Sequence, residues 1–174
     1  AISNDVEQVF WNPAGVALKD QTLQASFSYN KWFAELNHNS AAIAYNWNGI
    51  GTFALGVITF GASDIKADRD VYPNNPELWP YQIDNETGST FNYLDLAVSL
   101  TYSRYLLDNL SLGLTAKIIN ETIDDKSATA VAFDFGTVYD IGLFNWKIAA
   151  RMNNLGSDLT FYDFPVGLPL VFSV

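Results

Sequence analysis

The feature that most constrains the fold is an alternation of large apolar residues with small or polar ones. In residues 22–30, leucine, alanine, phenylalanine and tyrosine alternate with threonine, glutamine, serine and asparagine. Side chains of a β-strand project to opposite faces in turn, so each such segment has one apolar and one polar face. The helical period is not sustained, and the pattern predicts an all-β antiparallel protein. The predicted strands are 22–30, 41–47, 51–65, 94–103, 110–118, 130–139 and 144–152, with a last strand beginning near Leu168.

The connections between these strands differ in length. Asn48-Gly49 is typical of a two-residue hairpin turn, whereas Asp68–Ser89 contains three prolines and is expected to be a long loop. Short connections follow the second, fourth and sixth strands, and long ones follow the third and seventh. Transmembrane barrels show this asymmetry, and aromatic residues gather near both ends of the strands, as in interfacial girdles.

The less apolar face of each strand distinguishes a membrane barrel from a soluble sandwich or ligand-binding barrel. In a soluble protein this face meets water and should carry Lys, Glu and Arg. Here it carries mainly Ser, Thr, Ala, Gly and Asn, which suit a narrow lumen. The pattern therefore favours an antiparallel up-and-down transmembrane β-barrel, with about eight strands in this sequence.

Composition supports a protein whose outer surface meets lipid. Charged residues make up only 16% of the 174 residues, against roughly a quarter in ordinary soluble domains. The net charge of −10 argues against nucleic acid as a partner. There is no cysteine, which excludes disulfides and thiolate metal sites. No apolar run approaches the roughly 18 residues of a transmembrane helix, although a barrel strand needs only about 9–11.

Five charged residues lie on the small-residue faces, which would point into the lumen of a barrel. We expect them to form charge pairs that hold an N-terminal segment and neighbouring strands together. A catalytic role would need a nucleophile or a selected acid–base pair, and the sequence indicates neither. The lumen charges are Asp95, Lys117, Asp134, Lys147 and Arg151.

The sequence offers little material for metal or cofactor sites. His38 is the only histidine, so a His-based metal site or a Ser-His-Asp triad is not expected. Asp64, Asp68 and Asp70 lack the spacing and glycine of an EF-hand, and a solvated acidic loop is favoured. No glycine loop of the Walker or Rossmann kind is present. We therefore expect a protein that is not an enzyme and that binds neither a cofactor nor a metal.

A short helical segment is expected before the first strand. Asn4 or Asp5 would cap it. Asn12 and Pro13 would end it, because proline has no N–H and disfavours the helical region for the residue before it.

Three stretches, in this order, resemble the PorV/PorQ family of the type IX secretion system, which belongs among outer-membrane barrels related to FadL. The first stretch is Ser3–Gly15, which contains Asn-Pro-Ala-Gly. The second is Tyr29–Phe33 with the strand that follows it. The third is Asn153–Gly156 with Phe164–Leu170, which is similar to the family's "NLG…PLP" pattern.

The resemblance implies a FadL-like barrel in the outer membrane of a Bacteroidota-type bacterium. In such proteins the Asn-Pro-Ala segment lies inside the barrel near its periplasmic end. Residues 1–20 would then be a plug segment and residues 21–174 barrel strands. Relatives have about fourteen strands, so the chain is expected to be incomplete at both ends. The plug motif comprises Asn12, Pro13, Ala14 and Gly15.

The resemblance also implies a non-enzymatic role in type IX secretion, in which the barrel binds secreted cargo or surface-assembly proteins. The resemblance implies that cargo is received through the C-terminal signal domain that the cargo carries. Two alternatives stay open: a FadL-like transporter of small hydrophobic molecules, and a structural subunit of a surface assembly. Outer-membrane lipid would be a partner in each case. The outer-loop residues expected to bind a partner are Leu78, Trp79, Pro80 and Tyr81.

Overall fold

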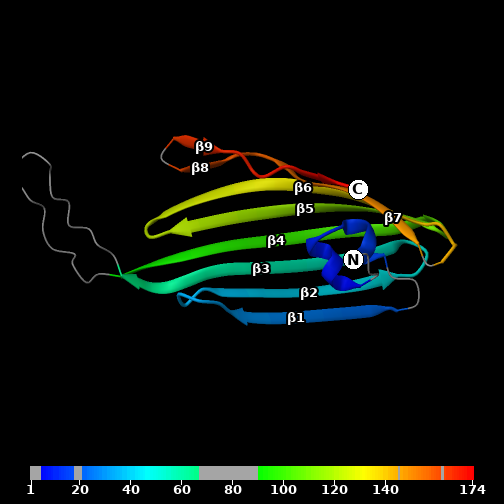
Figure 1. The fold of residues 1–174 in the computed structure, drawn as a ribbon, viewed down its shortest axis with the longest axis horizontal. Coiled ribbons are helices and arrows are strands. Elements are labelled where there is room, and N and C mark those ends of the chain that lie inside the picture. Colours follow the sequence, from blue (N-terminus) through cyan, green and yellow to red (C-terminus); the bar gives the residue numbers. More distant parts are fainter. Residues whose placement is uncertain (1–4, 18–20, 67–89, 145, 162) are drawn as a thin grey trace, which may run out of the picture.

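The structure is a computed structural model, and it describes residues 5–17, 21–66, 90–144, 146–161 and 163–174. Eight strands form one antiparallel sheet in the order β1-β2-β3-β4-β5-β6-β7-β10 (Figure 1). The all-β antiparallel prediction is confirmed. The strands of the sheet are β1 (Leu23–Lys31), β2 (Asn37–Trp47), β3 (Gly51–Lys66), β4 (Thr90–Leu107), β5 (Leu110–Ile123), β6 (Lys126–Asp140), β7 (Lys147–Gly156) and β10 (Val171–Ser173). A separate hairpin comprises β8 (Leu159–Phe161) and β9 (Phe164–Val166).

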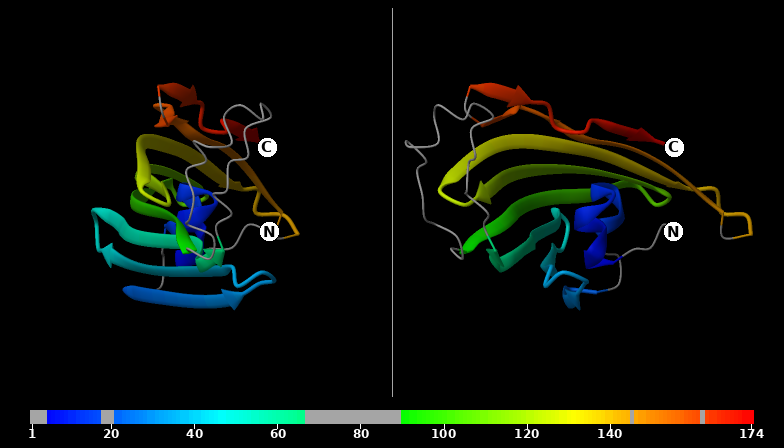
Figure 2. Two further views of the ribbon diagram at one scale, coloured as in Figure 1. Left: turned by 90° about the vertical axis from the view of Figure 1, so that its left-hand side faces the viewer. Right: turned by 60° about the vertical axis from the view of Figure 1, so that its left-hand side comes forward.

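The sheet is arched, and two short 3₁₀ helices lie on its concave side (Figure 2). The first, η1 (Val6–Phe10), is capped by Asp5, whose side chain accepts a hydrogen bond from the Glu7 N–H. The second, η2 (Pro13–Val16), is capped by Asn12. The predicted helical turn ends before Asn12-Pro13, as expected. A second turn, which was not predicted, begins at Pro13, because proline is well suited to the first helical position.

The two faces of the sheet differ in the size and the exposure of their side chains. One row on the convex face consists of large or apolar side chains, and among them Leu100 is 60% exposed. The next row, on the concave face, has small or polar side chains, and its Thr101 is fully buried. The convex row contains Ile43, Leu55, Leu100, Ala116 and Phe133. The concave row contains Ala44, Ala54, Thr101, Thr115 and Asp134.

Three convex rows, which contain Ala41, Ile43 and Tyr45, form what we call the apolar band. Beyond the Ala41 row, outward side chains become amides and hydroxyls on four strands. Asn39 donates to Thr59 at 3.2 Å, and Asn120 donates to Thr129 at 2.9 Å. The Tyr45 row is rich in aromatic residues: it contains Tyr45, Phe53, Tyr102, Leu114 and Phe135.

The sheet is open in the described part of the chain. There, β1 pairs only with β2, and β10 pairs only with β7. Closure into a barrel is therefore not part of the described structure. None of the helices among the described residues is long and apolar enough to span a membrane.

The seventh strand differs from its prediction. It begins at Lys147, because Phe144 has a φ of 54° and belongs to the preceding turn. It continues through Asn153 and Asn154 to Gly156, where the sequence predicted a looser segment. The last strand begins at Val171 rather than near Leu168. The long loop predicted at 68–89 lies outside the described residues.

Candidate functional site: the plug segment and the concave face

Residues 5–17, the described part of the predicted plug segment, are called the plug segment below. Their first helix, η1, packs against the inner face of β2 and β3, and η2 packs against β4, β5 and β6. Val6, Val9 and Val16 are buried, and Phe10 packs beside them. Their partners on the sheet are Ala42, Ala44 and Ala54. These alanines are small enough to let a helical turn sit directly on the strands, and the contact forms an apolar core inside the arch.

Three strand glycines provide the space in which the plug segment lies. A Cβ atom on Gly113 would lie 2.2 Å from the carbonyl carbon of Pro13. On Gly136 it would lie 2.0 Å from Asn12 Oδ1, and on Gly56 it would lie 2.8 Å from the Phe10 ring. Real Cβ atoms do not approach other atoms so closely, so these sites on β3, β5 and β6 require glycine for the observed packing.

Polar side chains bind the backbone of the plug segment. The Ala14 carbonyl accepts from the hydroxyls of Ser103 at 3.3 Å and Ser111 at 3.0 Å. Asn12 Oδ1 accepts from the Ala14 N–H at 3.0 Å, and Asn12 Nδ2 donates to the Thr137 carbonyl at 3.4 Å. Buried backbone groups need such partners, and here the strands supply them.

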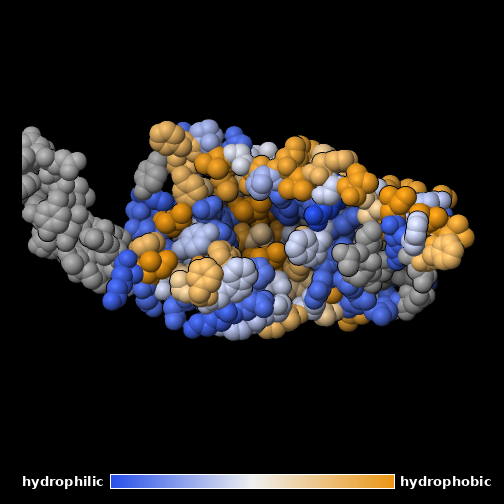
Figure 3. Space-filling view, in the orientation of Figure 1, coloured by the Kyte–Doolittle hydropathy of each residue, from blue (hydrophilic) through white to orange (hydrophobic). Residues whose placement is uncertain are grey.

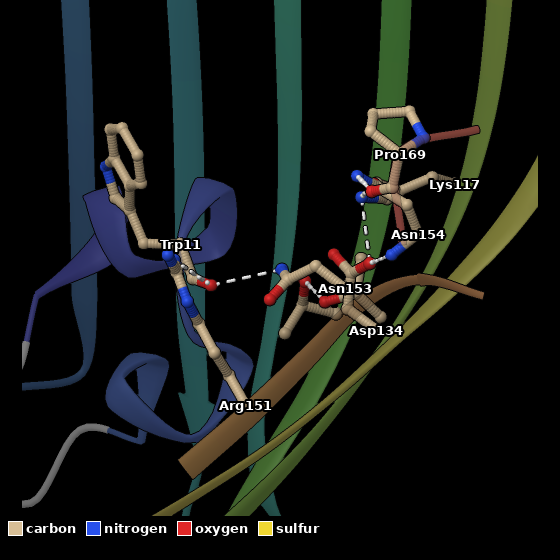
Figure 4. Close-up of polar contacts among 9 residues, drawn as sticks. Trp11, Lys117, Asp134, Arg151, Asn153, Asn154 and Pro169 are labelled. Atoms are coloured by element: carbon tan, nitrogen blue, oxygen red, sulfur yellow. Dashed lines mark hydrogen bonds and ion pairs between the residues drawn. The ribbon is translucent and has the colours of Figure 1, made fainter. Parts of the chain in front are cut away.

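A second carbonyl of the plug segment is bound from β7. The Trp11 carbonyl accepts from Arg151 Nη1 at 3.0 Å and from Asn153 Nδ2 at 3.1 Å (Figure 4). On β1, Gln24 accepts from the Val6 N–H at 2.8 Å. Sequence reasoning did not select Ser103, Ser111 or Asn153, because a polar residue on an inward face gives no indication of which carbonyl it will meet.

The predicted plug motif is buried within this arrangement. Asn12, Pro13, Ala14 and Gly15 all lie on the concave side. A Cβ on Gly15 would lie 2.6 Å from Gln8 Cγ, so the two helical turns pack closely on each other. The motif therefore contributes to packing in the interior of the arch. Its role as the plug of a closed barrel stays a prediction.

Two of the five predicted lumen charges form a pair with each other. Lys117 Nζ lies 2.8 Å from Asp134 Oδ1, and their side chains are 13% and 2% exposed. Lys117 also donates to Asn154 Oδ1 at 2.5 Å. Asp134 accepts from the Asn154 N–H at 2.8 Å, and Asn154 Nδ2 donates to the Pro169 carbonyl at 2.9 Å (Figure 4).

This network lies at a β-bulge. Opposite Asp134, the pairing of β6 with β7 shifts, so that Asn153 and Asn154 together face one residue. Asn154 has a φ of 64°, a left-handed conformation that asparagine tolerates better than most residues. The bulge turns one asparagine toward the plug segment and the other toward the segment around Pro169.

The remaining predicted charges lie apart from this pair. Arg151 contacts the plug segment, and Lys147 lies on the same strand. Asp95 lies on β4 and accepts a hydrogen bond from the Tyr93 hydroxyl. Among these five residues the described structure shows one ion pair, Lys117–Asp134, and Arg151 donates to a backbone carbonyl. The wider set of charge pairs stays a prediction.

A cavity of about 750 Å³ lies between the plug segment and β7. Its lining includes Trp11 and Ala149 together with the cationic residues Lys147 and Arg151. In the orientation of Figure 1, the surface shows hydrophilic and hydrophobic patches next to each other (Figure 3).

A row of aromatic and acidic residues crosses the concave face beyond the apolar band. His38, Phe60, Asp95 and Glu121 are successive partners on β2, β3, β4 and β5, so they project to the same face. Burial, followed by repulsion from Asp95, raises the pKa of Glu121. Burial and the hydrogen bond to Asp95 raise the pKa of Tyr93. Both shifts arise first from burial and then from the neighbouring Asp95.

The remaining residues singled out from the sequence are the candidate metal ligands, His38 and the expected partner-binding residues. Among the described residues, no group of three His, Cys, Asp or Glu side chains could hold a metal ion. The His38 ring lies 6.3 Å from the Phe60 ring. Asp68 and Asp70, and the expected partner-binding residues Leu78, Trp79, Pro80 and Tyr81, lie outside the described residues.

No protein-family model and no curated protein matches this sequence.

Proposed function

We propose that this chain forms the wall and plug of an outer-membrane β-barrel of the PorV/PorQ type. Its role would be to bind secreted cargo or surface-assembly proteins without catalysing a reaction. The observation that carries the proposal is the inverted polarity of the sheet, with large apolar side chains exposed on the convex face and small ones buried on the concave face. Lipid is the solvent that favours this arrangement.

The limits of the apolar band support the same proposal. A transmembrane barrel has an outward apolar zone about 25 Å tall, flanked by aromatic residues at the interfaces. On this sheet the band ends at the Asn39 and Asn120 row on one side, and its other margin is the aromatic Tyr45 row. Exposed Trp47 and Tyr139 continue the aromatic margin.

Membrane insertion would require both sheet edges to be paired. An unpaired backbone group in lipid costs several kcal/mol, so spanning sheets close into barrels. We propose that the edges of β1 and β10 are hydrogen-bonded in the membrane, which completes the barrel around the plug segment.

Binding of protein partners follows from the family resemblance and from the packing of the plug segment. Four side-chain hydrogen bonds to the Trp11 and Ala14 carbonyls hold this segment on the concave face. A lumen filled by the plug segment favours binding of partners at the surface of the barrel over transport of molecules through it.

Site-directed labelling tests the lipid-facing surface, and the absence of native cysteine makes each label unique. We expect an environment-sensitive fluorophore on Leu100→Cys, within the apolar band, to be quenched by a quencher dissolved in the lipid phase. Asn120→Cys, outside the band on the neighbouring strand, is the matched control and should respond to a water-soluble quencher. Water accessibility at Leu100 would rule out a membrane-facing wall.

The partner role requires a separate experiment. Detergent extraction from native membranes after chemical cross-linking should recover secreted or surface-assembly proteins with the barrel. Recovery of a lipid-like molecule without any protein would contradict this role and favour transport.

Transport of small hydrophobic molecules is the second candidate, favoured by the cavity of about 750 Å³ beside Trp11 and Ala149. Ala149→Trp would fill part of this volume, because Ala149 pairs with Val138 and shares its concave face. Under the transport hypothesis the variant should retain less co-purified lipid, whereas cross-linking to protein partners should be unchanged.

A further inference from the structure

The row of aromatic and acidic residues beyond the apolar band has the composition of a ligand site. Asp95 and Glu121 are direct cross-strand partners, and like charges in this position repel each other. Among the described residues, no ion pair joins either carboxylate to a basic group, and Lys117, on the same strand as Glu121, pairs with Asp134. The sheet therefore holds two negative charges together without a visible counter-ion.

A second observation points to a missing donor. Asp95 Oδ2 accepts from the Tyr93 hydroxyl. Asp95 Oδ1 is buried and has no hydrogen-bond partner in the described part of the chain. A buried acceptor without a donor is costly, so a group that carries N–H or O–H bonds would be stabilised at this atom.

Aromatic rings lie beside Asp95, since Phe60 is its cross-strand partner and the Tyr93 hydroxyl donates to it. The Phe60 ring makes edge-to-face contacts with Tyr93 at 6.1 Å and with Trp32 at 6.3 Å, and His38 lies 6.3 Å from it. Aromatic faces attract cations, and carboxylates next to them add charge and hydrogen-bond acceptors.

We propose that Asp95, Glu121, Phe60 and Tyr93 form a site for an organic cation bearing N–H donors, such as a primary ammonium or guanidinium group. Asp95 Oδ1 accepts a hydrogen bond from the cation, Glu121 neutralises its charge, and the rings cover its apolar part. This site goes beyond the proposed function and does not depend on membrane insertion, since it lies on the concave face.

Calorimetric titration of the whole chain in detergent micelles with n-butylammonium tests the site. Binding should be detectable and should weaken about tenfold or more in Glu121→Gln and in Asp95→Asn, because each removes a charged acceptor. Tetramethylammonium has the same charge but no N–H, and it should bind more weakly than butylammonium. Binding should also weaken as the pH falls through the raised pKa of Glu121, because protonation removes its charge.

Glu35→Gln is the matched control, since it removes one exposed carboxylate in the turn between β1 and β2. It should leave butylammonium affinity unchanged. An equal loss in Glu35→Gln and Glu121→Gln, or equal affinity for both cations, would reduce the effect to general charge attraction and overturn the proposal. The absence of any heat from butylammonium would overturn it as well. The Glu121 variant keeps the test valid if Asp95→Asn does not fold.

Discussion

The plug segment can lie on the sheet only where strand residues leave space for it, and Gly113 is one such residue. A Cβ at this position would meet the backbone of Pro13 and Ala14, which cannot move aside like a flexible side chain. We expect Gly113→Ala to lower the free energy of unfolding by about 1–3 kcal/mol. Thermal or urea unfolding in detergent micelles measures this change.

Gly167→Ala is the control for that substitution. Its added Cβ would have only one close atom, Asp158 Oδ1 at 3.6 Å, which is an ordinary contact. Stability should be nearly unchanged. If both alanine variants unfold like the parent chain, the plug segment does not lie on β5.

The buried Lys117–Asp134 pair predicts a second residue-scale effect. Lys117→Met would leave the Asp134 carboxylate buried without its counter-ion, at an expected cost of about 3–5 kcal/mol. Lys31→Met, in an exposed pair with Glu35, should cost less than about 1 kcal/mol. Unfolding measurements on both variants compare the costs, and equal losses would mean that the Lys117–Asp134 pair is solvated.

The alternation of residues indicates which face a side chain occupies but not its neighbour across the sheet. It placed Lys117 and Asp134 on the same type of face. Their pairing depends on strand register and on the bulge at Asn154, and neither can be read from one strand alone. Ser103, Ser111 and Asn153 bind the plug segment through contacts between residues some 90 to 140 positions apart, which local patterns do not predict.

At the scale of elements, the bulge in β7 ties the sheet to the segment around Pro169. Asn154→Gly keeps a backbone that tolerates a positive φ but removes the bonds to Lys117 and to the Pro169 carbonyl. Loss of about 1–2 kcal/mol would raise the open population of the segment 167–170 roughly 5- to 30-fold. Limited proteolysis should show faster cleavage there.

Asn30→Gly, near the C-terminal end of β1, controls for the general effect of an added glycine. It removes a hydrogen bond to Ser28 but no contact with the segment 167–170. Cleavage of that segment at the parent rate in Asn154→Gly would show that Leu168 packing alone holds it.

Elements with sustained period-two alternation were predictable, and the shorter ones were not. The strands β1 to β6 follow their patterns, although β2, β4 and β6 each begin four residues earlier than predicted and β5 ends five residues later. In β7 the bulge places Asn153 and Asn154 side by side, which breaks the alternation before the strand ends. The helix η2 and the strands β8 and β9 contain three or four residues each, too few for a period to be recognised.

At the scale of the whole molecule, the proposed membrane barrel makes a demand on the open edge of β1. Alternate amides of this strand point away from β2 and have no partner in the described structure. In lipid these groups must be hydrogen-bonded. We therefore expect them to be protected from hydrogen exchange when the protein is in native membranes, as strongly as the amides that pair with β2. Residue-resolved exchange on Leu23–Lys31 measures this, with the turn residues 33–35 as an unprotected reference. Exchange of the outward amides at the rate of that turn would mean that the edge is open to water, and the convex face would then need a covering other than lipid.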